Sequence, residues 1–275
     1  MKNIIGIIFL FLSICSTSSW ASINEIHNLD QFEAELESAD KNVLVILDVD
    51  NTLLVPNDSL FRPCCEHVLR RLLQMVNLGG RSRADYLESQ CLLDMKIDLV
   101  DPKMPGIIKN AQQKGIKCMA LTAMKSGTVG AISSMEDWRY DQLKEKDFDF
   151  SISFSPNTYL LLDEYDSDQF LPTFKHGVLT SGKYAKGKVL ASFLERLEFR
   201  PSKIIFIDDN LQCLQSVENE MKKLGIECSA YHYLAVNALP CTFDIDLIKF
   251  QCQYLLTHER WLSDEEARSI MQLEF

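Results

Sequence analysis

The chain has 275 residues, of which 47% are hydrophobic, so it can form one large core or a core with a modest appended unit. Its formal net charge of −11 and pI near 5.0 argue against a protein that wraps nucleic acid or adheres to an anionic membrane. The composition gives no sign of a disordered chain.

Residues 1–21 have the order of a secretory signal peptide. A lysine precedes an apolar run from Ile4 to Ile14, and a polar stretch then ends at Ala21. This run is too short to span a bilayer as a helix, so we expect cleavage after Ala21; a retained N-terminal anchor is the alternative. The mature chain, 22–275, is therefore predicted to be exported, periplasmic or secreted, with no stable membrane span. Cleavage removes one lysine and changes the net charge to −12.

Eight of the nine cysteines follow the predicted cleavage site, and an exported chain permits disulfides. Cys64, Cys65 and Cys91 share one segment and are candidates for a pair, although the connectivity stays open. Cys118 and Cys213 fall inside predicted core elements, so we expect buried free thiols there. The cysteines and histidines lack the spacing of a structural zinc site.

Apolar runs, mostly β-branched, predict buried strands at residues 43–47, 116–122, 202–209 and 226–233. Helical patterns precede the last three strands, at residues 105–115, 186–199 and 211–225. Alternation of helices with buried strands predicts an α/β fold with a doubly wound parallel sheet.

Two segments exceed what simple connections need. Helical spacing predicts an inserted helical cap at about 56–103. Short apolar runs at 148–154, 157–165 and 176–182 predict a small β extension at about 147–182. The tail is helical in pattern, and Ser263 followed by Glu266 predicts a capping box. We interpret the mature chain as one decorated domain.

Polar residues stand at the carboxyl ends of three predicted strands, where doubly wound sheets collect their ligands. They are Asp48 and Asp50, then Thr122, then Asp208 and Asp209. A lysine precedes the helix that leads to the strand at 202–209. Lys186 is the first choice for it, with Lys183 and Lys188 as alternatives.

The set "DVDNT", "LT", a lysine and "IDD" resembles the four motifs of the haloacid dehalogenase (HAD) superfamily over essentially all of the mature chain. The layout is also similar to that of exported bacterial HAD-like proteins of undefined function. The resemblance implies a HAD-like Rossmannoid fold. It also implies that Asp48 is a nucleophile that forms an aspartyl-phosphate, and that Asp50 protonates the leaving oxygen and then activates water.

The same resemblance implies Mg²⁺ as the cofactor. The metal would be held by Asp48, by the backbone carbonyl of Asp50 and by Asp208, with Asp209 next to it or bound through water. Thr122 and the motif lysine would bind the phosphate oxygens and stabilise their charge.

Asp50 points to a phosphatase, because the dehalogenase branch of the superfamily lacks a second aspartate at this position. We therefore expect a magnesium-dependent phosphomonoester hydrolase for a small phosphorylated substrate. The alternatives are a non-catalytic secreted interaction protein with the same fold, and a phosphotransferase. The motifs taken singly also fit polar turns or helix caps. Their coincidence at several strand ends argues against that interpretation, while the substrate and the oligomeric state stay open.

Overall fold

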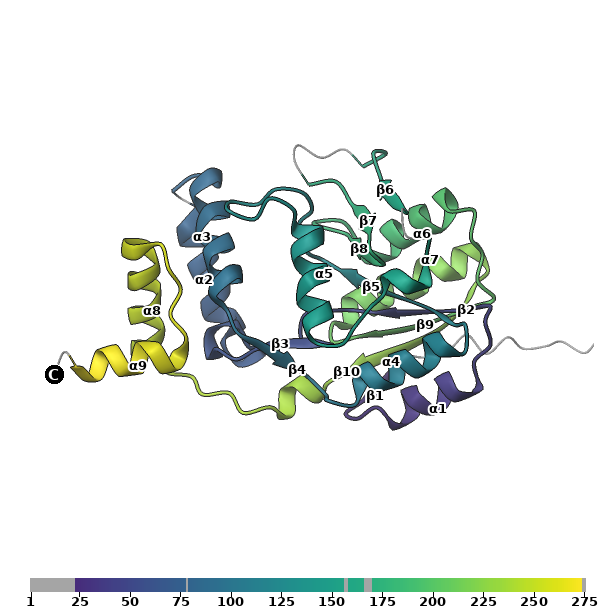
Figure 1. Cartoon of the computed structure of the whole chain (residues 1–275), viewed down its shortest axis with the longest axis horizontal. Coiled ribbons are helices and arrows are strands. Elements are labelled where there is room, and N and C mark those ends of the chain that lie inside the picture. The colour runs from purple at the N-terminus through teal and green to yellow at the C-terminus, as the bar shows by residue number, and fades with distance from the viewer. Residues whose placement is uncertain (1–22, 78, 156–157, 166–169, 274–275) are drawn as a thin grey trace, which may run out of the picture.

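The computed structural model describes residues 23–77, 79–155, 158–165 and 170–273 (Figure 1). The predicted signal peptide, residues 1–21, lies outside this part of the chain. None of the helices within the described residues has both the length and the apolar character needed to cross a membrane.

A mostly parallel sheet lies at the centre of the molecule (Figure 1). Its strand order is β1 (Asn24–Ile26), β10 (Glu227–Tyr233), β9 (Lys203–Asp208), β2 (Val43–Leu47), β5 (Lys117–Thr122), β8 (Val178–Thr180), β7 (Thr173–Lys175) and β6 (Tyr159–Leu161). In this order, each neighbouring pair from β1 through β10, β9, β2 and β5 to β8 is parallel. The last two pairs, β8 with β7 and β7 with β6, are antiparallel. The four predicted buried strands correspond to β2, β5, β9 and β10, which confirms the α/β class.

Helices flank both faces of the sheet. One face packs against α1 (Asp30–Ser38), α4 (Met104–Gln113) and α5 (Met135–Glu145), and the other against α6 (Lys186–Arg196) and α7 (Leu211–Leu224). Successive residues of a strand point to opposite faces. Accordingly Val45 packs in the core beside α1 and α4, whereas Leu44 and Ile46 pack in the core beside α6 and α7. Burial on both faces explains why β2 is apolar throughout.

The segment from 54 to 103 contains two helices, where an inserted helical cap at about 56–103 was predicted. It begins and ends with an antiparallel pair, β3 (Leu54–Pro56) and β4 (Ile97–Leu99). Two short 3-10 turns, Ser59–Phe61 and Pro63–Cys65, lead into α2 (Glu66–Asn77) and α3 (Arg81–Asp94).

The tail packs on this insert, which was not predicted. It consists of α8 (Ile245–His258) and α9 (Asp264–Leu273), which lie beside α2 and α3 at one end of the molecule (Figure 1). Insert and tail share a core in which Trp261 is 1% exposed. The Trp261 indole Nε1 donates to Asp58 Oδ2 at 2.9 Å. The predicted capping box is present, because the Glu266 amide donates to Ser263 Oγ and the Ser263 amide donates to the Glu266 carboxylate.

Of the three cysteines named as candidates for a pair, one forms a disulfide, and its partner lies outside their segment. Cys64 forms a disulfide with Cys241, whereas Cys65 and Cys91 are free thiols. The reason is that the segment between β10 and the tail passes beside the insert. Cys118 is a buried free thiol, as predicted. Cys213 is free but only partly buried, because it faces a pocket.

The predicted β extension is correct in part. β6 and β8 lie in the runs at 157–165 and 176–182, but the strand predicted at 148–154 is wrong. Asp149 Oδ1 accepts hydrogen bonds from the amide and hydroxyl of Ser151, and this local turn leads into a 3-10 turn at Ser151–Ser153. β7 lies outside the three predicted runs and was missed. Gly177 in the β7–β8 turn has φ +79°, and a Cβ there would lie 2.4 Å from the Phe150 carbonyl oxygen.

Candidate active site

The predicted site residues lie at the carboxyl ends of three neighbouring strands. Asp48 directly follows β2, Asp208 is the last residue of β9, and Thr122 is the last residue of β5. Since β2 pairs with both β9 and β5 in parallel, all three ends meet at one edge of the sheet. The fold therefore brings together residues that are up to 160 positions apart.

A sharp turn after β2 keeps both aspartates of the first motif at this edge. The Val49 carbonyl accepts hydrogen bonds from the amides of Leu53 and Leu54, each at 2.9 Å. Asn51 adopts φ +66°, a left-handed conformation that asparagine tolerates better than most residues. The backbone thus turns back immediately and leaves Asp48 buried and Asp50 exposed.

Lys186 lies between two buried carboxylates. Its Nζ donates to Asp48 Oδ1 at 2.5 Å and to Asp208 Oδ2 at 2.8 Å. The three side chains are 3%, 7% and 1% exposed. Lys186 is the first residue of α6, and the next residue explains its placement. A Cβ on Gly187 would lie 2.0 Å from the Ser216 carbonyl oxygen, so glycine allows α6 to approach α7 closely.

A third carboxylate completes an acidic cluster. Ligand oxygens of Asp48, Asp208 and Asp209 lie within 4.8 Å of one another. Thr52 connects two of these residues, because its hydroxyl donates to Asp48 Oδ2 at 3.2 Å and accepts from the Asp209 amide at 3.1 Å. The Asn210 amide donates to Asp208 Oδ1 at 2.7 Å.

The cluster holds more negative charge than the lysine compensates. Burial raises the pKa of Asp48 well above its usual range; Lys186 opposes this shift, while Asp208 and Asp209 add to it. Burial and the neighbouring Asp208 carboxylate raise the pKa of Asp209 to about 7. Burial alone would lower the pKa of Lys186, but Asp48 and Asp208 outweigh burial and raise it. The lysine is therefore held in its charged form, and the site favours an additional cation.

Asp50 is held by an arginine that the sequence did not single out. Arg139 Nη2 donates to both carboxylate oxygens of Asp50, at 2.9 and 3.2 Å. The Arg139 side chain is 5% exposed and Nη1 donates to Gln142 Oε1, whereas the Asp50 side chain is 56% exposed. A buried cation thus fixes a carboxylate that faces the solvent side of the pocket.

The remaining predicted residues are Thr122, Lys183 and Lys188. Thr122 is fully buried, its hydroxyl accepts from the Met124 amide, and the next residue, Ala123, lines the pocket. Lys183 lies over the Tyr184 ring, with its Nζ 5.6 Å from the ring centroid, and Lys188 is exposed. Among the three candidate lysines, Lys186 is therefore the one that contacts Asp48 and Asp208.

A pocket of about 330 Å³ opens over these carboxylates. Its floor contains Asp48, Asp50, Lys186, Asp208 and Asp209. Other lining residues come from the insert; we call this part of the lining the cap wall, and it consists of Phe61, Arg62, Pro63, Glu66 and Leu69. The predicted insert therefore borders the site.

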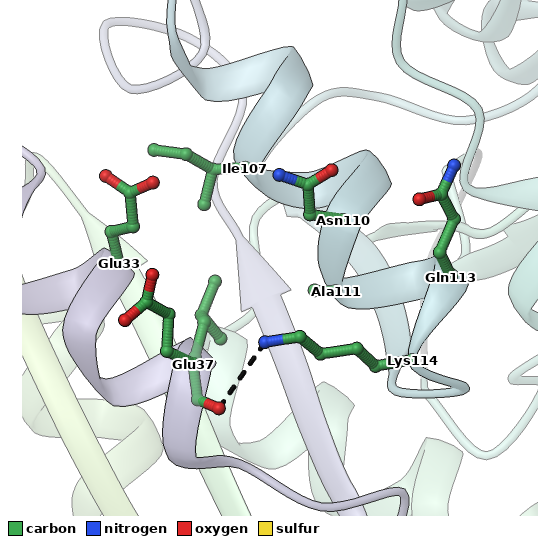
Figure 2. Close-up of a pocket in the computed structure, with 8 residues that line it drawn as sticks. Glu33, Glu37, Ile107, Asn110, Ala111, Gln113 and Lys114 are labelled. Atoms are coloured by element: carbon green, nitrogen blue, oxygen red, sulfur yellow. Dashed lines mark hydrogen bonds between the residues drawn. The ribbon is translucent and has the colours of Figure 1, made fainter.

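A second hollow, of about 390 Å³, lies between α1 and α4 (Figure 2). Glu33 and Glu37 of α1 face α4, and Lys114 Nζ donates to the Glu37 carbonyl at 3.4 Å. The other groups that line it are amides and apolar side chains, so the hollow lacks the charge cluster of the first pocket.

Comparison with known proteins adds relatives but no activity. The protein family described as "Protein of unknown function (DUF2608)" matches residues 25–268. An uncharacterized protein of Rickettsia felis is 27% identical over 241 residues, which cover 82% of this chain and 81% of that protein. Uncharacterized proteins of Rickettsia conorii and Rickettsia prowazekii are 27% and 20% identical, and the latter match covers 98% of this chain and 99% of the relative.

Proposed function

This chain belongs to the DUF2608 family, whose description assigns no function, and from the geometry of its site we propose that it is a magnesium-dependent phosphomonoester hydrolase of the HAD type. The observation that carries the proposal is the buried Asp48–Lys186–Asp208 arrangement at the carboxyl edge of the sheet. Three oxygen ligands, one ammonium and a pocket for a small molecule are the parts that phosphoryl transfer requires.

The donor set fits a hard divalent cation. Carboxylate oxygens are the ligands that Mg²⁺ prefers, and those of Asp48, Asp208 and Asp209 lie within 4.8 Å of one another. Asp50 would add its backbone carbonyl. Burial and neighbouring carboxylates raise the pKa values of Asp48 and Asp209, and a bound cation would oppose both shifts. When bound, the cation would neutralise charge on the phosphate and on the nucleophile.

Asp48 is positioned to act as the nucleophile. One of its carboxylate oxygens attacks the phosphorus, the bond from phosphorus to the ester oxygen breaks, and an aspartyl-phosphate forms on Asp48. Lys186, held between Asp48 and Asp208, stabilises the charge of the transferring group. The backbone after β5, at Ala123, lines the pocket and would serve as a further partner for the phosphate oxygens, whereas Thr122 is fully buried and supports this turn through its hydrogen bond with the Met124 amide.

Asp50 is suited to the proton transfers. It gives a proton to the leaving alcohol oxygen, and then removes a proton from the water that hydrolyses the aspartyl-phosphate. The products are the alcohol and inorganic phosphate. Arg139 orients the Asp50 carboxylate. Because the Asp50 side chain is exposed to the pocket, it can reach the leaving group.

The Cys64–Cys241 disulfide supports the proposal that the chain is exported. Disulfides form and persist in oxidising compartments such as the periplasm or the extracellular medium.

A hydrolase assay with p-nitrophenyl phosphate tests the proposed function. We expect turnover that requires Mg²⁺, is lost in Asp48→Asn, and is retained in the matched control Asp246→Asn, an exposed residue on α8. Folded wild-type protein that hydrolyses none of a broad panel of phosphate esters with Mg²⁺ present would favour a non-catalytic interaction protein. A new ester product after addition of an alcohol acceptor would favour a phosphotransferase.

A further inference from the structure

The cap wall takes no part in the proposed chemistry, so it indicates which leaving group the pocket accepts. Three of its side chains, Phe61, Pro63 and Leu69, are apolar, and two, Arg62 and Glu66, are charged. All five come from one short segment at the start of the insert. The leaving group of a phosphate bound at Asp48 would therefore meet an apolar surface with two charges.

The two charged side chains of the cap wall differ in their contacts with the rest of the protein. Arg62 Nε donates to the Pro56 carbonyl at 2.8 Å, and its Nη1 donates to the Pro240 carbonyl at 2.7 Å. This guanidinium therefore connects the start of the insert to the segment before the tail. Glu66 pairs with Arg70 of the same helix, but the two side chains are 65% and 71% exposed. Such a pair contributes little, which leaves the Glu66 carboxylate able to bind a cation from the pocket side.

The whole pocket is short of positive charge. Five carboxylates line it against two cations, Lys186 and Arg62. Arg139 also pairs with Asp50 and Arg70 with Glu66, so the five carboxylates and four cations leave one negative charge when all are ionised. The charges of a bound Mg²⁺ and a phosphate dianion cancel each other, so the leaving group still meets the excess negative charge of the pocket. The Asn51 Oδ1 of the same pocket is a buried acceptor that lacks a hydrogen-bond partner among the described residues.

We propose that the substrate is the phosphate monoester of a small amino alcohol, an inference that rests on the proposed function. Its ammonium group lies against the Glu66 carboxylate and the Phe61 ring, while its phosphate occupies the floor at Asp48 and Lys186. Carboxylate and aromatic face are the two groups that recognise an alkyl ammonium. A pocket of about 330 Å³ suits a ligand of this size. A leaving group with a carboxylate or second phosphate meets like charge here.

Three phosphate monoesters of similar size test this inference: O-phosphoethanolamine, propyl phosphate and 2-phosphoglycolate, with cationic, neutral and anionic leaving groups. With Mg²⁺ present, we expect kcat/KM to be highest for O-phosphoethanolamine and lowest for 2-phosphoglycolate, with about a tenfold difference between these two. Glu66→Lys is expected to lower the ratio of these two kcat/KM values about tenfold, and Glu66→Gln to lower it by less. Glu195→Lys, an exposed change on α6 with the same effect on net charge, should keep the wild-type ratio.

Equal kcat/KM values for the three esters, or a preference for 2-phosphoglycolate, would overturn the inference and leave the proposed function standing. The same holds if p-nitrophenyl phosphate is hydrolysed but none of the three esters is. If the wild-type protein hydrolyses neither p-nitrophenyl phosphate nor the three esters, the proposed function fails and the substrate inference fails with it. A ratio that changes equally in Glu66→Lys and Glu195→Lys would show that net charge, rather than Glu66, sets the preference.

Discussion

Replacing Lys186 with methionine tests the charge arrangement of the site. Methionine keeps an unbranched apolar chain but removes the ammonium that contacts Asp48 at 2.5 Å and Asp208 at 2.8 Å. These carboxylates are at most 7% exposed, so water from the pocket replaces the lost partner only in part. We expect a large loss of stability in metal-free buffer.

The size of the stability loss in Lys186→Met depends on whether the carboxylates stay charged or take up a proton. Removing one partner of a buried ion pair costs about 3–5 kcal/mol. The alternative is proton uptake, which for a carboxyl with an ordinary pKa of 3.8 costs about 4 kcal/mol at pH 7 and about 2 kcal/mol at pH 5. The folded variant then holds a proton that the unfolded chain releases, so the stability of the variant falls relative to wild type as pH rises from 5 to 7.

Urea denaturation followed by circular dichroism, in EDTA and then in Mg²⁺, measures this effect. Lys188→Met on the same helix is the matched control, because Lys188 is exposed and its loss should change the free energy of unfolding by less than about 0.5 kcal/mol. Mg²⁺ should restore part of the stability of Lys186→Met. If the two variants are equally stable at pH 7, the reasoning about the buried charges is refuted.

Three further predictions concern packing, the disulfide and pH. Gly187→Ala places a Cβ 2.0 Å from the Ser216 carbonyl oxygen, so it should lower the free energy of unfolding by about 1–3 kcal/mol in urea titrations; an unchanged midpoint would contradict this close approach. Cys241→Ser removes the bond to Cys64, which closes a loop over a separation of 177 residues, and should cost about 2–5 kcal/mol in thermal unfolding; dithiothreitol should bring the wild type to the same stability. Burial would raise the pKa of Glu35, but hydrogen bonds from its lysine, tyrosine and serine partners lower it overall. Wild-type stability should therefore fall as pH drops from about 5 to 3, and Glu35→Gln should flatten this slope in urea titrations at each pH.

The residues that meet at the strand ends could be predicted because their signals are local. An apolar run followed directly by polar residues marks β2 and β9, and the same strand ends supply Asp48 and Asp208. Parallel strands then place these ends at one edge of the sheet. The choice of Lys186 as the motif lysine also depended on a local signal, because Lys186 begins the helix before β9.

The missed contacts join residues that are far apart in the chain. Arg139 contacts Asp50 across 89 positions, and nothing around Arg139 distinguishes it from an ordinary helical arginine. The Cys64–Cys241 pairing and the packing of the tail on the insert depend on the path of the segment after β10, which the helical pattern of the tail does not encode. The chemistry of the floor was therefore more predictable than the shape of the cap wall above it.

Trapping of the phosphorylated protein tests the central claim most directly. The wild type is incubated with Mg²⁺ and a substrate ester and quenched with borohydride, which reduces an aspartyl-phosphate to homoserine, and peptide mass spectrometry then locates the change. We expect homoserine at position 48, dependent on Mg²⁺ and absent from Asp48→Asn. Turnover without modification at this position, or modification of a different carboxylate, would contradict it.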